Sequence, residues 1–297
     1  MELRQLEYFV AVAEEANFTR AAARVHVSQS GISAQIRQLE NDLGAPLFDR
    51  STRIATLTTA GEAALAHARA ALAAARAVRD AVDDVNQLVR GRLEVGMVTA
   101  CTVTPLFDAL SAFHRAHPGV DVSLLEDNSD RLVDGVRGGA IDLALVGIPG
   151  HPPTDLASLT LVSEGLVAAA PAGHPLTRMP TVTLAEVVAH PLVTLPMGTG
   201  IRAVLEQGCA DLRCRPDIAL QASAPDAVAD LAMRGLGVAI LSESMASSYP
   251  GLESRPIADI AVDAVLALVW KHEPAPALRE LLMHTRNAFT VPASRAS

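Results

Sequence analysis

FTRAAARVHVSQSGISAQIRQLENDL, residues 18–43, is the stretch that decides the fold of the N-terminal part of the chain. It predicts two short helices, capped by the hydroxyls of Thr19 and Ser28, with only His26 and Val27 between them. A connection this short forces the second helix across the first, which is the geometry of a helix-turn-helix. Because such a helix can enter the major groove, the sequence predicts double-stranded DNA as a partner.

The second predicted helix has one apolar face and one polar face. Apolar residues recur at positions 32, 36, 39 and 43, and Gly44 is typical of the end of a helix. Polar side chains opposite them can hydrogen-bond to base edges and phosphates, although an ordinary solvated face is the plain alternative. Across both helices, the candidate DNA contacts are Thr19, Arg20, Ser28, Gln29, Ser30, Ser33, Gln35 and Arg37.

The overall charge restricts how the chain can bind DNA. The 297 residues carry a net charge of -9, with an isoelectric point near 5.4, which excludes a general polyanion binder of the histone kind. Between residues 16 and 39, however, there is no Asp or Glu. Only this local surface is expected to meet phosphate.

Composition indicates a cytoplasmic protein with substantial cores. Half of the residues are hydrophobic, which is enough for two or three domains. The N-terminal residues MELRQLEYFVAVAEE predict an amphipathic helix and no signal peptide, and no apolar run reaches the roughly 18 residues of a membrane span. Cys101, Cys209 and Cys214 lack the spacing of a disulfide framework or zinc site. We therefore expect no membrane partner, metal or cofactor.

A hairpin and a long helix are predicted after the helix-turn-helix. Residues 49–58, DRSTRIATLT, predict a small wing whose Arg50 and Arg53 contact phosphates. The helix over residues 59–90 would be a rod of roughly 45 Å. Its apolar stripe is too long for the small N-terminal domain, so we expect it to pair with the same helix of a second chain; packing on its own domain is the alternative. The expected dimer contacts are Leu65, Leu72, Val82 and Val89.

Strands and helices alternate from residue 93 onward. The segments 93–98, 120–125 and 141–147 predict strands linked by helices over 105–117 and 131–137, which together indicate a parallel sheet covered on both faces. A similar set follows over residues 166–241, and then a strand over 264–270 and a helix over 276–289. The sequence thus predicts two similar α/β lobes in tandem.

Several of these motifs together resemble the LysR-type transcriptional regulators. They are FTRAAARVHVSQSGISAQIRQLENDLGAPLFDR, LTTAGEA, RLEVGMV, AHPGVDVSLLE, GAIDLALVG and RGLGVAIL. The resemblance implies an α/β fold class: an N-terminal all-α winged helix-turn-helix, a long linker helix that dimerises, and a two-lobed α/β effector domain similar to type 2 periplasmic binding proteins. It also implies a homotetramer of paired dimers that bends promoter DNA, responds to a small molecule and contacts RNA polymerase.

The resemblance also places the domain limits. It implies a DNA-binding domain over residues 1–58, a linker helix over 59–90, lobe I over 91–160 with residues 265–291 returning to it, lobe II over 161–264, and a tail over 292–297. Two departures stand out: Ala34 replaces a common Arg, and the wing has Ile54, Ala55 and Thr56 where basic residues are usual. We expect fewer phosphate contacts and a flatter salt dependence of binding.

A ligand in the cleft between the lobes should meet the carboxyl ends of strands and the N-termini of helices. Hydroxyls and one arginine in those loops favour an organic anion. Helix capping by the threonines and a surface ion pair at Arg202 are the alternatives. The candidate effector contacts are Thr99, Cys101, Thr102, Asn128, Ser129, Thr199, Ile201 and Arg202.

Other interpretations rest on weaker patterns. GTGIRA at 198–203 matches a dinucleotide-binding glycine pattern, but Asp217 precedes the strand that it should end, so we expect no NAD-dependent enzyme. A thiol-based redox sensor would use Cys209 and Cys214, but its loop cysteine is replaced by Gly200. A plain solute-binding protein would not carry the N-terminal module.

Overall fold

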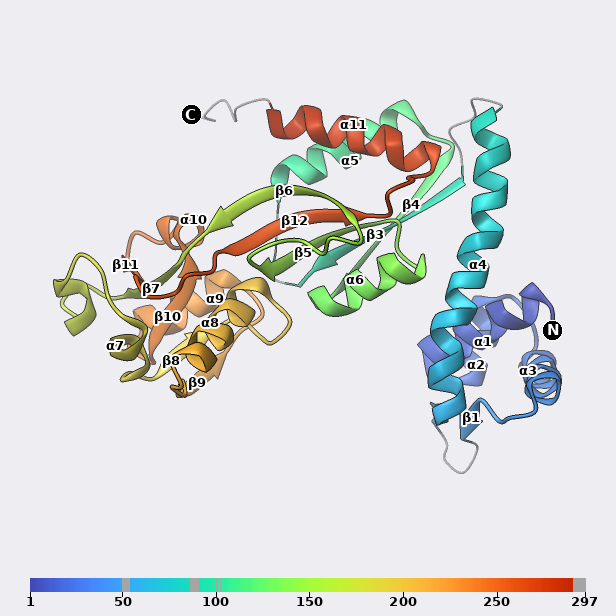
Figure 1. The fold of residues 1–297 in the computed structure, drawn as a ribbon, viewed down its shortest axis with the longest axis horizontal. Coiled ribbons are helices and arrows are strands. Elements are labelled where there is room, and N and C mark those ends of the chain that lie inside the picture. The colour runs from blue at the N-terminus through green and yellow to red at the C-terminus, as the bar shows by residue number, and fades with distance from the viewer. Residues whose placement is uncertain (50–53, 86–90, 100, 102, 291–297) are drawn as a thin grey trace. The chain divides into compact units, whose positions relative to one another are not determined.

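The computed structural model describes residues 1–49, 54–85, 91–99, 101 and 103–290, which form two compact units. The first contains α1 to α4, and the second begins at β3 (Figure 1). No helix in these described ranges has both the length and the apolar content needed to cross a membrane. Arg50, Arg53, Val89, Thr102 and the predicted tail lie outside the described residues.

The first unit is built from helices around one small core. Its elements are α1 (Leu3–Glu15), α2 (Phe18–Arg24), α3 (Gln29–Leu43), β1 (Phe48–Asp49), β2 (Thr56–Leu57) and α4 (Thr59–Val85). Phe9 and Phe48 pack edge to face at the centre, with ring centroids 5.6 Å apart. His26 adopts the left-handed conformation, with φ of 55°, which turns the chain between α2 and α3. The predicted two-helix motif is confirmed.

Two details of that motif differ from the prediction. The predicted cap at Thr19 is wrong: α2 begins one residue earlier, and Asn17 Oδ1 accepts from the backbone N–H of Thr19 at 2.8 Å. Leu43, expected on the buried face of α3, is 46% exposed because the helix ends there at Gly44, in the left-handed conformation. Ser28 caps α3 as predicted, accepting from the N–H of Gly31 at 3.0 Å.

Lobe I of the second unit is a five-stranded sheet in the order β4-β3-β5-β12-β6. β3, β4 and β5 pair in parallel as predicted, whereas β12, the strand expected to return to this lobe, runs antiparallel between β5 and β6. α5 and α11 cover one face and α6 covers the other (Figure 1). The elements are β3 (Gly91–Val98), α5 (Thr104–Ala116), β4 (Val120–Asp127), α6 (Ser129–Gly138), β5 (Leu143–Pro149), β6 (Ala157–Glu164), β12 (Ala264–Trp270) and α11 (Pro276–Thr290).

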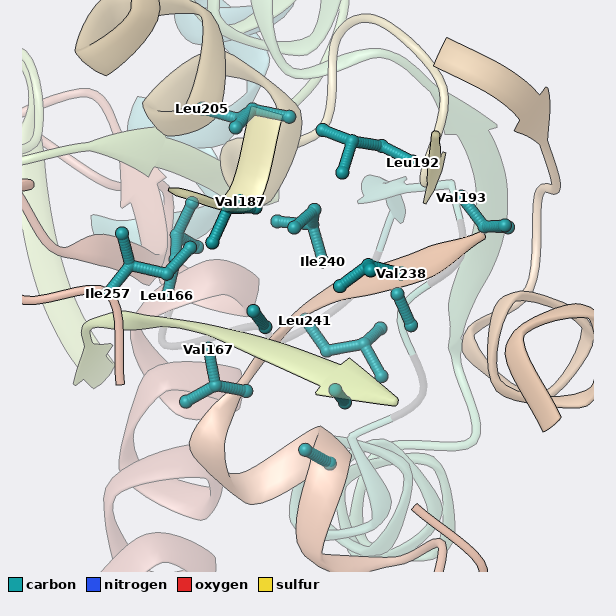
Figure 2. Close-up of a cluster of buried hydrophobic side chains, with 14 of the residues drawn as sticks. Leu166, Val167, Val187, Leu192, Val193, Leu205, Val238, Ile240, Leu241 and Ile257 are labelled. Atoms are coloured by element: carbon teal, nitrogen blue, oxygen red, sulfur yellow. The ribbon is translucent and has the colours of Figure 1, made fainter. Parts of the chain in front are cut away.

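Lobe II is a second five-stranded sheet in the order β11-β7-β10-β8-β9. Its core is made of aliphatic side chains from the sheet and its helices, including Ile240 of the central strand (Figure 2). The elements are β7 (Leu166–Ala170), the 3-10 helix η1 (Pro175–Arg178), α7 (Leu184–Val188), β8 (Leu192–Thr194), α8 (Gly200–Asp211), β9 (Ile218–Gln221), α9 (Pro225–Met233), β10 (Val238–Ser242), α10 (Glu243–Ser247) and β11 (Glu253–Pro256).

The chain passes between the lobes twice. Gly165 alone separates β6 from β7, and residues 257–263 connect β11 to β12. β6 runs through the predicted lobe limit at residue 160, and it pairs with β12 along its length. The two connections lie side by side in the topology, because each joins adjacent strands of one sheet to adjacent strands of the other.

Candidate functional site

The exposed face of α3 carries most of the predicted DNA contacts. Gln29, Ser30 and Arg37 are exposed and Ser33 is half-buried, opposite the fully buried Ile32. The Gln29 amide donates to Ser33 Oγ at 3.1 Å, and Arg37 Nε donates to the Ser33 carbonyl at 3.3 Å. These side chains therefore form one polar strip along the outward side of the helix.

Gln35 and Arg20 have protein partners that reduce their availability to DNA. Gln35 is half-buried, and its side-chain oxygen accepts from the amide of the buried Gln5 at 3.3 Å, which ties α3 to α1. Arg20 forms an ion pair with Glu15 at 3.4 Å. Arg24 is likewise paired with Glu14 at 2.8 Å. Of the three arginines near the turn, Arg37 alone has no ion-pair partner among the described residues.

The predicted wing exists where the structure describes it. β1 and β2 pair antiparallel, with Phe48 opposite Leu57. Glu40 of α3 holds the start of this hairpin, because its Oε1 accepts from the backbone N–H groups of Leu47 at 2.9 Å and Phe48 at 3.3 Å. A carboxylate on the recognition helix thus positions the wing. Sequence reasoning missed this role of Glu40.

α4 divides its apolar stripe between two environments. Leu65 and Leu72, predicted as dimer contacts, pack against the core of their own unit, as the alternative interpretation expected. Farther along, Val78 is 67% exposed and Val82 is 57% exposed. The part of α4 open to a second chain therefore lies beyond Leu72.

A cavity of about 790 Å³ lies between the two lobes. Thr99 and Cys101 line it from lobe I, and Thr199 and Ile201 line it from lobe II, so four predicted contacts come together. Asn128, Ser129 and Arg202 do not line it. Arg202 is buried in lobe II, where Nε donates to Glu206 at 2.9 Å and Nη1 donates to Thr194 at 2.9 Å.

Among its described lining residues, the cavity has carboxylates and no Lys, Arg or His. Glu126 comes from the end of β4, and Asp226 comes from the start of α9. Tyr249 donates to Asp226 at 2.5 Å, and burial together with this bond raises the pKa of Tyr249 to about 12. Sequence reasoning missed this side of the cavity, although the rule about strand ends, applied to β9 and β10, would have found it.

The N-terminus of α8 faces the same cavity without a side-chain cap. The Thr199 hydroxyl donates backwards to the Pro196 carbonyl at 2.8 Å and leaves the first N–H groups of the helix uncapped. Gly200 and Ile201, the first helical residues, line the cavity. This corner is the electropositive part of the described lining, because the partial charge at a helix N-terminus is positive.

The thiols lack the features of a redox sensor. Burial raises the pKa of Cys101 to about 11, and burial together with Cys214 raises the pKa of Cys209 to about 12. Both shifts disfavour the reactive thiolate. A side chain at Gly200, the position of the missing loop cysteine, would have its Cβ 2.7 Å from the carbonyl carbon of Gly147. The glycines of GTGIRA thus serve contact between the lobes.

Two family models match the chain. "Bacterial regulatory helix-turn-helix protein, lysR family" matches residues 3–62, and "LysR substrate binding domain" matches residues 86–290. The second match alone covers more than half of the chain.

Similar proteins cover nearly the whole length. "Uncharacterized HTH-type transcriptional regulator YnfL" of Escherichia coli (strain K12) is 35% identical over 300 residues, which cover 97% of this chain and 99% of that protein. The structure of a full-length OxyR variant from Pseudomonas aeruginosa has a TM-score of 0.70 and 27% identity, with 99% of this chain and 96% of that chain covered.

The structure of full-length CbnR in complex with its target DNA has a TM-score of 0.57 and 29% identity, and the match covers 97% of this chain and 100% of that chain. Relatives, family models and solved structures therefore agree on both parts of the molecule. The chain belongs to the LysR family of DNA-binding transcriptional regulators and has an N-terminal helix-turn-helix and an effector-binding domain.

Proposed function

We propose that this regulator binds promoter DNA with the exposed strip of α3, twice per homodimer, and that two dimers form a tetramer. The observation that carries the proposal is the strip itself, Gln29, Ser30, Ser33 and Arg37, on the face opposite the buried one. Amides and hydroxyls can recognise base edges, whereas the arginine can reach phosphate. That CbnR has been solved with its target DNA supports this use of the fold.

The exposed part of α4 supports dimerisation. Val78 and Val82 are one helical turn apart and form an apolar continuation of the helix stripe. The proposal places the protein in the cytoplasm, with RNA polymerase as a further partner at the promoter.

The effector in this proposal is a small molecule that carries one anionic group. The uncapped start of α8 and the lining hydroxyls can accept that group, and Arg202 is left out because it already pairs with Glu206 and Thr194. Glu126 and Asp226 would repel a second negative charge in the same cavity. Monocarboxylates should therefore bind better than dicarboxylates of equal length.

Footprinting of the DNA that flanks the coding region tests the DNA part of this proposal. We expect protection of two half-sites about one helical turn apart, with a pattern that changes when an active acid is added. Calorimetry with matched acids such as hexanoate and adipate tests the cavity, with Thr99→Ala as the cavity variant and Thr160→Ala, on the exposed side of β6, as its control. Equal affinities in all variants would remove Thr99 from the site.

A further inference from the structure

Lobe II touches lobe I through a loop next to the cavity. The backbone N–H of Ser129, at the start of α6, donates to the carbonyl of Gly198 at 3.0 Å. Ser129 is 3% exposed, so this bond is shielded from water. Gly198 has φ of +85°, and a Cβ added there would lie 2.4 Å from the Cβ of Asn128. The loop therefore fits against α6 only with glycine at this position.

A second contact joins the lobes through backbone atoms alone. A Cβ added to Gly200, the first residue of α8, would lie 2.7 Å from the carbonyl carbon of Gly147 and 2.7 Å from the nitrogen of Ile148. Neither atom can rotate away as a side chain could. The N–H of Gly147 in turn donates to Ser129 Oγ at 3.0 Å. We name Ser129, Gly147, Gly198 and Gly200 the lobe latch.

The lobe latch and the cavity share residues. Gly147 and Gly200 both line the cavity, beside Thr199 and Ile201. The lobes are otherwise joined by the two chain connections, at Gly165 and at residues 257–263, and paired connections of this kind allow two lobes to rotate about them. Any rotation that separates the lobes must break the latch contacts, because each contact joins backbone of one lobe to the other or supports such a contact.

We propose that the lobe latch is a two-state conformational switch: formed, it fixes the closed arrangement of the lobes, and it must open for a ligand to enter or leave the cavity. Close-packed backbone contacts are either made or lost and have no intermediate arrangement, which gives the switch two discrete states. The inference rests on the proposed function only in taking the cavity as the effector site.

Hydrogen exchange of the full-length protein, with no ligand added, tests the latch directly. The amides of Ser129 and Gly147 are its two donors, so peptides that contain them report its opening. In Gly200→Ala, where the new methyl group forces the lobes apart, we expect exchange in both peptides to be about tenfold faster or more. Gly119→Ala is the matched control, because a Cβ at Gly119 meets nothing within 4 Å.

Ser129→Ala provides a second variant with a smaller change. It removes the acceptor of the Gly147 N–H and keeps the Ser129 N–H that bonds to Gly198, so faster exchange should appear chiefly at Gly147. Wild-type rates in both variants would overturn the proposal. If Gly200→Ala raises exchange throughout lobe II, including β10, the substitution has unfolded the lobe; the Ser129→Ala result then decides, with faster exchange at Gly147 for the latch and an unchanged rate against it. Promoter binding by the wild type is measured separately, so failure of the proposed function is distinguishable from failure of the latch.

Discussion

Single residues of α3 divide DNA recognition into two kinds of contact. Gln29 has an amide suited to base edges, so Gln29→Ala should relax base preference at one position, by about 1–3 kcal/mol. Arg37→Ala should weaken binding to all sequences similarly, because a phosphate contact carries no sequence information. Affinities for a set of single-base operator variants distinguish the two effects.

Gln38→Ala is the matched control on the same helix, because the Gln38 amide donates to Asp42 at 2.9 Å within the protein. It should leave both affinity and base preference unchanged. A loss confined to one base pair in Arg37→Ala would contradict the phosphate role of that residue.

The cysteines make a pH-dependent prediction. Alkylation needs the thiolate, and the pKa values of Cys101 and Cys209 are raised to about 11 and about 12, above the ordinary value of a cysteine. Alkylation at pH 7 should therefore be at least about a hundredfold slower in the folded protein than in the unfolded chain, and should accelerate as pH rises. Mass spectrometry after iodoacetamide treatment measures this, and equal folded and unfolded rates would contradict it.

Some residue roles could be predicted from sequence and others could not. Ser28 was predictable because its cap is local, and Asn17 could have been chosen over Thr19 because Asn is a strong cap one residue before Phe18. The Arg202 partner Glu206 is four residues away on the same helix, a spacing visible in sequence. Thr194, the other Arg202 partner, depends on how α8 packs against β8, which no local pattern gives.

Among the elements, the wing depends on Glu40. Glu40→Ala should destabilise the first unit by about 1–3 kcal/mol, because two backbone N–H groups lose their charged acceptor. Glu40→Gln keeps an acceptor oxygen and should lose less. Urea denaturation followed by far-ultraviolet circular dichroism gives both values, and equal stability of Glu40→Ala and wild type would contradict the role assigned to Glu40.

The second half of α4 makes a prediction about assembly. Val78→Asp puts a charge on the exposed apolar stripe and should weaken the dimer, because a carboxylate is costly to bury in an apolar interface. Ala66→Asp is the control: Ala66 is also exposed, but it lies about 120° around the helix. Sedimentation across a concentration series should show dissociation for the Val78 variant alone; an unchanged state would contradict dimerisation through this stripe.

Elements with strong apolar patterns were predictable, and edge strands were not. β3, β5 and β10 are runs of buried residues, so their positions follow from composition. β6 alternates exposed and half-buried positions, and β11 contains Arg255 and Pro256, so neither has a marked apolar run. Both lie at sheet edges, where pairing with one neighbour defines the strand.

At the scale of the whole molecule, two compact units have separate chemistry. One presents a polar helix face suited to DNA, and the other encloses a cavity with carboxylates, hydroxyls and an uncapped helix start. The predicted anion site changed most on inspection of the structure, because its arginine is buried within lobe II. Regulation then depends on a ligand event in one unit changing how two α3 helices meet DNA.

The most direct measurement is the ratio of affinities for a promoter fragment and for random DNA, by fluorescence anisotropy with the intact protein at about 0.15 M salt. The fragment is the DNA that flanks the coding region, with Gln29→Ala measured alongside. We predict a preference of about a thousandfold or more, reduced in the variant. Equal affinity of the wild type for both DNAs, with and without a metabolite extract, would contradict the claim that α3 recognises sequence.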